Sequence, residues 1–108
     1  MQANVASKEV IHFVGIGGIG MSGLAQIMHN VGFKIQGSDI SQSKNVDRLR
    51  KFGIKIFIGH TKQNIKNTTM LVISSAIKKN NNEYLFAKKR KLPIYKRGDM
   101  LANIVLLK

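Results

Sequence analysis

Residues 10–20 of this 108-residue chain read VIHFVGIGGIG, a strand-like run that passes directly into glycines. The run VIHFV is β-branched and aromatic, which is typical of a buried strand. After the glycines, residues 21–31 carry apolar side chains at a spacing that lines one helix face. Asn30 and Gly32 are residues typical of the end of such a helix. The stretch therefore predicts a strand, a glycine turn and a helix in direct succession.

The glycines of this stretch form the motif G-x-G-x-x-G at the junction of the strand and the helix. Gly15 permits a tight turn, Gly17 lets the backbone approach a pyrophosphate, and Gly20 allows the helix to pack closely on the strand. Free amides at Gly18 and Ile19 are then expected to face an anion, with the helix dipole behind them. We interpret the motif as a phosphate-binding turn rather than a glycine-rich loop without a ligand.

Strands and helices alternate along the rest of the chain. Strands are expected at residues 33–37, 54–58, 70–73 and 94–95, and helices between residues 41 and 53, from Asn81 or Asn82 to Pro93, and over residues 97–107. In the helix before Pro93, the side chains expected to pack inward are Tyr84, Leu85 and Ala87.

The short connections favour parallel βαβ units. We therefore predict an α/β fold, a doubly wound Rossmann-like five-stranded parallel sheet in the order 3-2-1-4-5, as a single domain over residues 1–108. Its ligand crevice is expected at the carboxyl ends of strands 1 and 4.

Polar and small residues follow the predicted strands. Asp39 stands 19 residues after Gly20 at the end of strand 2, where an acid accepts a hydrogen bond from a ribose hydroxyl, although a carboxylate there can also cap a local turn. His60 ends strand 3, and Ser74, Ser75 and Ala76 end strand 4 beside the crevice. Two further histidines are interpreted structurally: His12 as a core side chain and His29 as a helix-end residue.

Composition excludes several classes of chemistry. The chain has no cysteine, so disulfides, thiolate metal sites and cysteine nucleophiles are impossible. It also lacks an H-E-x-x-H motif, a nucleophile elbow and a G-x-x-x-x-G-K-[ST] loop, and its five acids are too few for a paired-carboxylate site. We therefore expect no catalytic residue, no metal and no cofactor bound by the chain. Without a signal peptide or an apolar run of about 18 residues, we expect a cytoplasmic protein with no membrane partner.

The formal net charge of +13 is typical either of a solvated surface or of a nucleic-acid-binding domain. Lysine and arginine total 18, and the densest run, residues 88–91, stands at the end of a predicted helix, where cations complement the macrodipole. No aromatic residues interleave with this run as a stacking platform for single strands requires. We interpret the charge as a solvated surface and expect no specific nucleic-acid partner, with a nucleic-acid-binding domain as the alternative.

Five blocks in order resemble one family. Residues 11–23, IHFVGIGGIGMSG, closely resemble the opening of the Mur ligases of peptidoglycan synthesis, in particular those that join L-alanine to UDP-N-acetylmuramate. The later blocks are GSD at 37–39, GH at 59–60, SSAI at 74–77, and Arg97-x-Asp99-Met100-Leu101. The resemblance covers nearly all of residues 10–103. Related ligases that attach a murein tripeptide, and NAD-binding modules of dehydrogenases or redox sensors, are the alternatives.

The resemblance implies an ATP- and magnesium-dependent enzyme of three domains. Such ligases activate the muramoyl carboxylate as an acyl phosphate, which the amine of L-alanine attacks. The first domain is Rossmann-like and holds the UDP part of the substrate, while the P-loop and the amino-acid site belong to the other two domains. The chain would then be the first domain of a longer ligase, inactive alone, with UDP-N-acetylmuramate and the missing domains as its partners.

The resemblance also assigns roles to site residues. Gly17, Gly18 and Ile19 would meet the pyrophosphate or the adjoining sugar, and Arg97 would pair with a phosphate or carboxylate. The remaining assignments place Ser38 and Asp39 at the ribose and uracil with His60 nearby, and Ser74, Ser75 and Ala76 along the path to the muramoyl group. The chain departs from the family pattern at three places, where the family has Ala for Ile19, Asn-Pro-Glu for residues 81–83 and Arg-Ala-Glu for residues 97–99.

Overall fold

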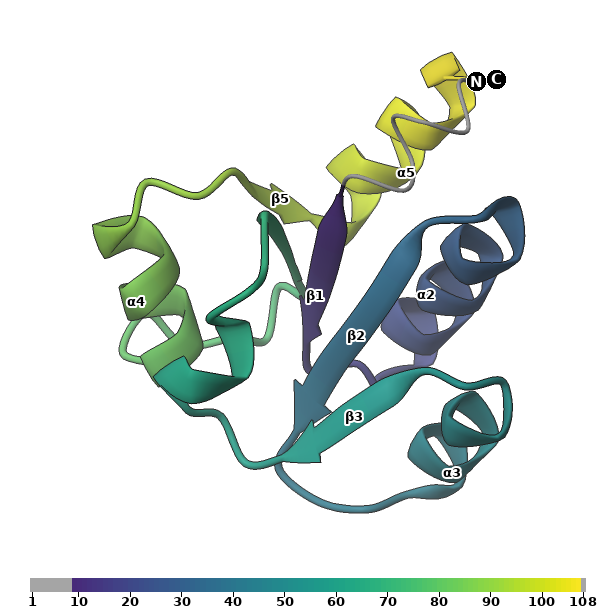
Figure 1. Cartoon of the computed structure of the whole chain (residues 1–108), viewed down its shortest axis with the longest axis horizontal. Helices are drawn as coiled ribbons and strands as arrows, with labels where there is room; N and C mark the ends of the chain where they lie inside the picture. The colour runs from purple at the N-terminus through teal and green to yellow at the C-terminus, as the bar shows by residue number, and fades with distance from the viewer. Residues whose placement is uncertain (1–8, 108) are drawn as a thin grey trace.

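Five strands pair in parallel in the order β3-β2-β1-β4-β5 in a computed structural model that describes residues 9–107 (Figure 1). The strands are β1 (Val10–Val14), β2 (Lys34–Asp39), β3 (Lys55–Ile58), β4 (Met70–Ile73) and β5 (Ile94–Lys96). The central strand β1 is buried along four of its five residues, because helices cover both faces of the sheet. The predicted fold class and strand order are confirmed.

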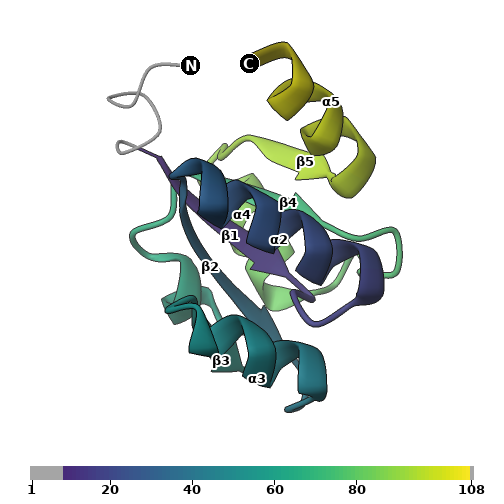
Figure 2. The ribbon, with the colours of Figure 1, turned by 90° about the vertical axis from the view of Figure 1, so that its right-hand side faces the viewer.

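Helices form a layer on each face of the sheet (Figures 1 and 2). On one face lie α2 (Ile19–Val31), α3 (Lys44–Lys51) and α5 (Arg97–Leu107), and on the other lie α4 (Asn82–Lys89) and the 3-10 helix η1 (Lys62–Ile65). The larger core cluster packs α2, α3 and Met100 onto the sheet, and a smaller one packs Ala87 of α4 and Ile65 of η1 onto its opposite face. None of the helices within residues 9–107 combines the length and the apolar character that crossing a membrane requires.

Two element boundaries differ from the prediction in ways that shape the site. Strand β2 continues through Asp39 rather than ending at residue 37, because Ser38 pairs with Val14 on one side and with Phe57 on the other. Helix α2 begins at Ile19 rather than at residue 21, so its first turn lies inside the glycine motif. The helix η1 was not predicted, since its sequence KQNI is short and polar.

Helix α4 was only partly predicted. Its N-cap is Asn81, whose side chain accepts hydrogen bonds from the amides of Glu83 and Tyr84, and this confirms one of the two expected caps. The expectation that Leu85 packs inward is wrong, because Leu85 is 50% exposed. The helix instead packs through Glu83 and Ala87, which stand four residues apart on one face and are both fully buried.

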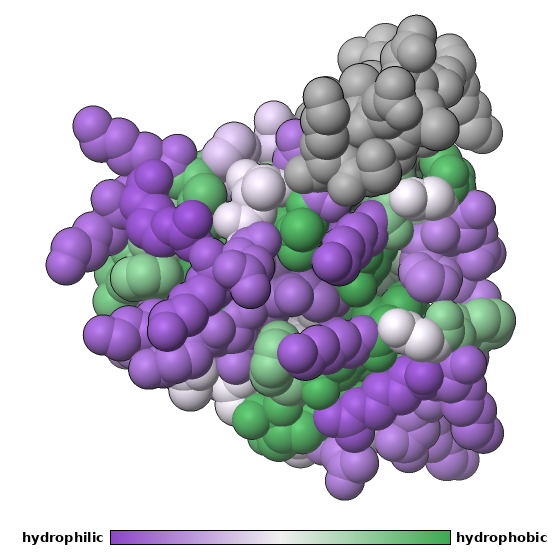
Figure 3. All heavy atoms as spheres, in the orientation of Figure 1, coloured by the Kyte–Doolittle hydropathy of each residue, from purple (hydrophilic) through white to green (hydrophobic). Residues whose placement is uncertain are grey.

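The basic run at residues 88–91 lies at the end of α4, as predicted, and has structural contacts there. The guanidinium of Arg90 donates to the backbone oxygen of Ile65 at 2.9 Å and stands 5.7 Å from the Phe86 ring centre. Lys88 likewise lies over the Tyr84 ring at 5.5 Å. Hydrophilic side chains cover much of this side of the molecule in Figure 3. These contacts agree with a solvated, partly structural role for the charge.

Candidate functional site

The carboxyl ends of the strands meet at one edge of the sheet and carry the predicted site. Two adjoining hollows of about 630 and 480 Å³ open there, and both are lined by Gly18, Ser74 and Ala76. The larger one also includes Gly15, Gly17, Asp39 and His60, and the smaller one includes Ile19, Gly20, Ser75 and Arg97. The structure thus brings together all of the predicted residues except Ser38, which is fully buried in β2 and contacts His60 of the larger hollow through its hydroxyl group.

The glycine motif is held by hydrogen bonds within the protein. Gly15, at φ +82°, and Ile16 both donate their amides to the carbonyl oxygen of Ser38, at 2.9 and 3.0 Å. The Gly18 amide, expected to be free for an anion, donates instead to the carbonyl of Gly15 at 3.1 Å and closes the turn. Gly17 donates to a carboxylate oxygen of Asp39 at 2.7 Å. Two of the amides that the motif was expected to offer are therefore already paired.

Asp39 joins the end of β2 to the glycine turn. Its Oδ2 accepts from the Gly17 amide, and its Oδ1 accepts from the Ile40 amide at 2.8 Å. The carboxylate thus caps a local turn, which was the alternative interpretation of this residue. Each oxygen keeps a further acceptor position, so hydrogen bonding to a ribose hydroxyl stays a prediction.

The unpaired amides lie one residue further along than expected. The backbone amide of Ser22 donates to the carbonyl oxygen of Gly18, and this is the first helical hydrogen bond of α2. The preceding amides of Ile19, Gly20 and Met21 have no acceptor among residues 9–107, and Gly18 supplies no side-chain cap. Such amides, at the positive end of a helix dipole, form a site for an anion.

Arg97 lies directly beside these amides. A Cβ atom built on Gly20 would stand 2.8 Å from Arg97 Nε and 2.9 Å from its Cδ, so the absence of a side chain at Gly20 is what lets the arginine approach the first turn of α2. Arg97 is exposed and forms no salt bridge within the described part of the chain. The first turn and the guanidinium therefore form one positively charged corner of the smaller hollow.

Behind the larger hollow lies a buried carboxylate that sequence reasoning missed. Glu83 is fully buried, and its Oε1 accepts from Ser38 Oγ at 2.6 Å and from His12 Nε2 at 2.9 Å. Its Oε2 accepts from Asn64 Nδ2 at 2.7 Å and from the Thr61 amide at 3.3 Å. Burial alone raises the pKa of Glu83, but the hydrogen bond and the charge attraction from His12, together with the hydrogen bonds from Ser38 and Asn64, outweigh it, so that the pKa lies below its ordinary value. Glu83 is therefore an ionised and fully hydrogen-bonded group.

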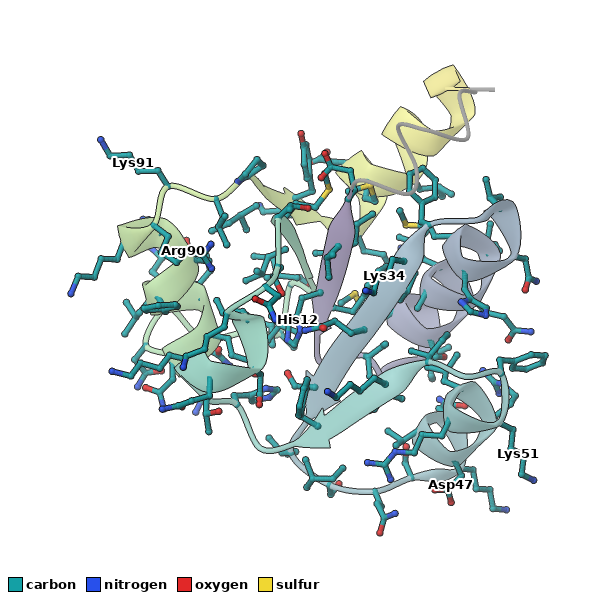
Figure 4. All side chains as sticks on the ribbon, in the orientation of Figure 1. His12, Lys34, Asp47, Lys51, Arg90 and Lys91 are labelled. Atoms are coloured by element: carbon teal, nitrogen blue, oxygen red, sulfur yellow. The ribbon has the colours of Figure 1, made fainter. Side chains whose placement is uncertain are left out.

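His12 occupies the centre of this network (Figure 4). Its Nδ1 accepts from the side-chain nitrogen of Gln36 at 2.8 Å, and the same nitrogen donates to the carbonyl of Asn64 at 2.7 Å, which fixes the orientation of the Gln36 amide. The proton of His12 therefore lies on Nε2 and points to Glu83. His12 is a core histidine, as predicted. No buried side-chain nitrogen or oxygen in the described residues lacks a partner.

Replacing Gly20 by alanine is expected to weaken anion binding without destabilising the fold. The new Cβ would displace the flexible end of Arg97 rather than backbone, so the guanidinium would leave the first turn of α2. We expect inorganic pyrophosphate to bind about tenfold more weakly, the loss of one hydrogen bond to a charged group. Isothermal titration of both proteins measures this change.

The matched control is Gly23→Ala on the same helix, where a Cβ atom meets nothing within 4 Å. This variant is expected to gain about 0.5–1 kcal/mol of stability, because alanine favours a helix interior over glycine, and to bind pyrophosphate as the unmodified chain does. Equal affinities for the Gly20→Ala and Gly23→Ala variants would contradict the placement of Arg97 at the anion site.

Comparison with known proteins gives consistent matches. A model of the Mur ligase family, described as its catalytic domain, matches residues 10–108. The chain is 63% identical over 107 residues to a UDP-N-acetylmuramate–L-alanine ligase of Pelagibacter ubique and 57% identical over 100 residues to one of Rickettsia bellii. These matches cover 99% and 93% of the chain but 23% and 21% of the relatives. The chain thus spans less than a quarter of the length of these curated relatives.

Solved structures of ligases share the fold. A crystal structure of UDP-N-acetylmuramate–alanine ligase from Thermotoga maritima matches 88% of this chain with a TM-score of 0.84 and 35% identity, and the match covers 22% of that chain. A UDP-N-acetylmuramate:L-alanyl-γ-D-glutamyl-meso-diaminopimelate ligase from Neisseria meningitides matches 90% of this chain with a TM-score of 0.83 and 25% identity. This match covers 31% of the ligase chain.

Proposed function

This chain belongs to the Mur ligase family, and we propose that it is the UDP-N-acetylmuramate-binding domain of a longer ligase that joins L-alanine to that substrate in peptidoglycan synthesis. The observation that carries the proposal is the corner formed by Arg97 and the three unpaired amides of α2, which lies in the smaller hollow beyond the carboxyl ends of β1, β4 and β5. The diphosphate group of a nucleoside diphosphate is an anion of the size and charge that such a corner binds.

The two hollows suit different parts of this substrate. We assign the diphosphate to the amides of residues 19–21 and to Arg97, and the ribose and uracil to the larger hollow with Asp39 and His60. Ser74, Ser75 and Ala76 lie between these regions and leave room for the sugar and the muramoyl group, because their side chains are small. The chain binds and orients the substrate in this proposal and carries no catalytic residue.

The residues of this chain do not fit ATP with its magnesium ion. The sequence has no G-x-x-x-x-G-K-[ST] loop, and residues 9–107 contain no group of three or more histidine or acidic side chains placed to hold a metal ion. We assign the activation of the muramoyl carboxylate and the amino-acid site to other domains of a longer protein, which the coverage of 21–23% of the relatives supports. The isolated chain is accordingly expected to show no ligase activity.

Two other functions fit the chain less well. The tripeptide-adding ligases share the fold, but the identity of 25% to one of them is well below the 63% and 57% to the alanine ligases. A dinucleotide-binding module is disfavoured by the relatives, because the two curated relatives reported above, at 63% and 57% identity, are UDP-N-acetylmuramate–L-alanine ligases. The identities therefore favour the alanine ligase.

Thermal-shift titration of the chain with UDP-N-acetylmuramate, UDP and NAD tests the proposal. A ligand that binds only the folded state raises the melting temperature, by the equivalent of about 2.7 kcal/mol at a hundredfold excess over Kd. We expect UDP-N-acetylmuramate and UDP to raise the melting temperature by several degrees and NAD to leave it unchanged. Stabilisation by NAD but not by the uridine nucleotides would contradict the proposal.

A further inference from the structure

The hydrogen bonds behind the larger hollow have a fixed direction. Ser38 Oγ and Glu83 Oε1 are 2.6 Å apart, so a proton lies between these two oxygens. The carboxylate is ionised, and the serine hydroxyl carries a single proton. That proton is therefore donated to Glu83, and Ser38 Oγ can only accept hydrogen bonds from its other neighbours.

His60 is one of those neighbours. Its Nδ1 lies 2.8 Å from Ser38 Oγ, and because the serine accepts, Nδ1 must carry the proton. The other ring nitrogen, Nε2, is then an acceptor in the neutral imidazole. Nε2 has no partner among the described residues, and none of their buried polar side-chain atoms is unpaired, so Nε2 is accessible from outside the protein, and His60 lines the larger hollow.

We propose that Glu83 is a positioning residue that, through Ser38, fixes His60 with an acceptor nitrogen facing the cleft, where it binds an N–H or O–H donor of the nucleoside. This proposal rests on the proposed function for the identity of the ligand. It separates the cleft into two regions of opposite hydrogen-bonding character: the corner with Arg97 offers donors to an anion, and the His60 side offers an acceptor to a nucleoside donor. A uridine nucleotide presents such donors at the imide nitrogen of the base and at the ribose hydroxyls.

The tautomer itself can be measured without any ligand. Nitrogen-15 NMR of the histidine side chains of the chain, in a buffer of about pH 8, is expected to show His60 protonated at Nδ1 and unprotonated at Nε2. In Glu83→Gln the side-chain amide can donate to Ser38, which frees the serine proton for His60 Nδ1, so the Nε2–H tautomer is expected to increase. A proton on Nε2 of His60 in the unmodified chain would overturn the proposal.

Two substitutions of His60 separate its two nitrogens. In His60→Asn the amide nitrogen takes the approximate place of Nδ1 and keeps the bond to Ser38, but nothing replaces Nε2. In His60→Gln the amide oxygen reaches the approximate place of Nε2 and keeps an acceptor in the cleft. We expect the asparagine variant to bind UDP about 3- to 10-fold more weakly and the glutamine variant to lose less than about 3-fold. Affinity of the asparagine variant equal to that of the unmodified chain would overturn the proposal.

Nucleotide analogues identify the donor. N3-methyl-UDP lacks the imide N–H, and 2′-deoxy-UDP and 3′-deoxy-UDP each lack one hydroxyl. One of the three is expected to bind the unmodified chain about 3- to 10-fold more weakly than UDP and to show no such loss in His60→Asn. Equal losses in both proteins for every analogue would overturn the inference. If UDP itself does not bind, the proposed function fails, and the NMR measurement still decides the tautomer.

Discussion

The Glu83→Ala variant is expected to lose about 3–5 kcal/mol of the free energy of unfolding, because several buried hydrogen-bond donors would lose their acceptor at about 1–3 kcal/mol each. The carboxylate is fully buried and accepts hydrogen bonds from His12, Ser38 and Asn64, and these donors would face a cavity instead. A domain of this size has only about 5–15 kcal/mol of stability in total. Urea denaturation followed by circular dichroism measures the difference.

Two variants serve as controls for this prediction. Glu83→Gln keeps the side-chain volume and one acceptor oxygen, so its loss is expected to be smaller, about 1–3 kcal/mol. Asp47→Ala removes the same charge from an exposed position in the first turn of α3 and is expected to cost less than about 1 kcal/mol. A loss in Glu83→Ala no greater than that in Asp47→Ala would show that the network contributes little to stability.

The same carboxylate makes stability depend on pH in the acid range. The pKa of Glu83 in the folded state lies below its ordinary value of 4.5, so the unfolded chain takes up this proton first as the pH falls. The stabilisation is therefore fully present above about pH 4.5 and is lost as the pH falls through the folded-state pKa. His12 from β1 and His60 after β3 are the titratable groups that face this carboxylate, and both are also present in the Glu83→Gln variant. The comparison is thus with Glu83→Gln, whose stability is expected to fall less steeply below pH 4.5.

The burial of Glu83 could not be predicted from its neighbours in the sequence. An acid just after an asparagine cap usually faces solvent, where it favours the helix dipole. Glu83 is buried because the sheet places His12, 71 residues away, and Ser38, 45 residues away, under the start of α4. The same packing turns Leu85 outward, contrary to the prediction. Both outcomes depend on which face of α4 meets the sheet, and a helix of eight residues with mixed polarity does not indicate that face.

The location of the site was easier to predict than its hydrogen-bonding character. Because the carboxyl ends of parallel strands meet at one edge, sequence position alone brings Asp39, His60 and residues 74–76 together. Which backbone amides stay unpaired depends instead on the exact start of α2 and on the partner of each glycine. Gly18 pairs inside the turn and Gly17 pairs with Asp39, so the unpaired amides begin at Ile19.

Gly37 shows a close approach that the motif alone does not reveal. It lies in β2 opposite Phe13 of β1, beneath the turn that starts at Gly15. A Cβ atom built there would stand 2.5 Å from Ile16 Cδ1, 2.7 Å from Ile16 Cβ and 2.8 Å from the carbonyl oxygen of Phe13. Ile16 is fully buried, and its amide is held by the carbonyl of Ser38 at 3.0 Å. Neither neighbour can move without disturbing the glycine turn.

Replacing Gly37 by alanine is therefore expected to cost about 3 kcal/mol of stability, the upper end of the range for overpacked cores, because two of the three close contacts involve backbone or a Cβ atom rather than a flexible side-chain end. Adding Ile16→Ala removes only the clash with Cδ1 and leaves a cavity in the core, so the double variant is expected to be less stable than Gly37→Ala. Urea denaturation of both variants, with Gly23→Ala as the glycine-to-alanine control in open space, measures the effect. Stability of Gly37→Ala equal to that of the unmodified chain would mean that β2 and the glycine turn lie further apart than described. Because the shifted turn also carries the amides of residues 19–21, we expect the folded fraction of Gly37→Ala to bind UDP more weakly as well.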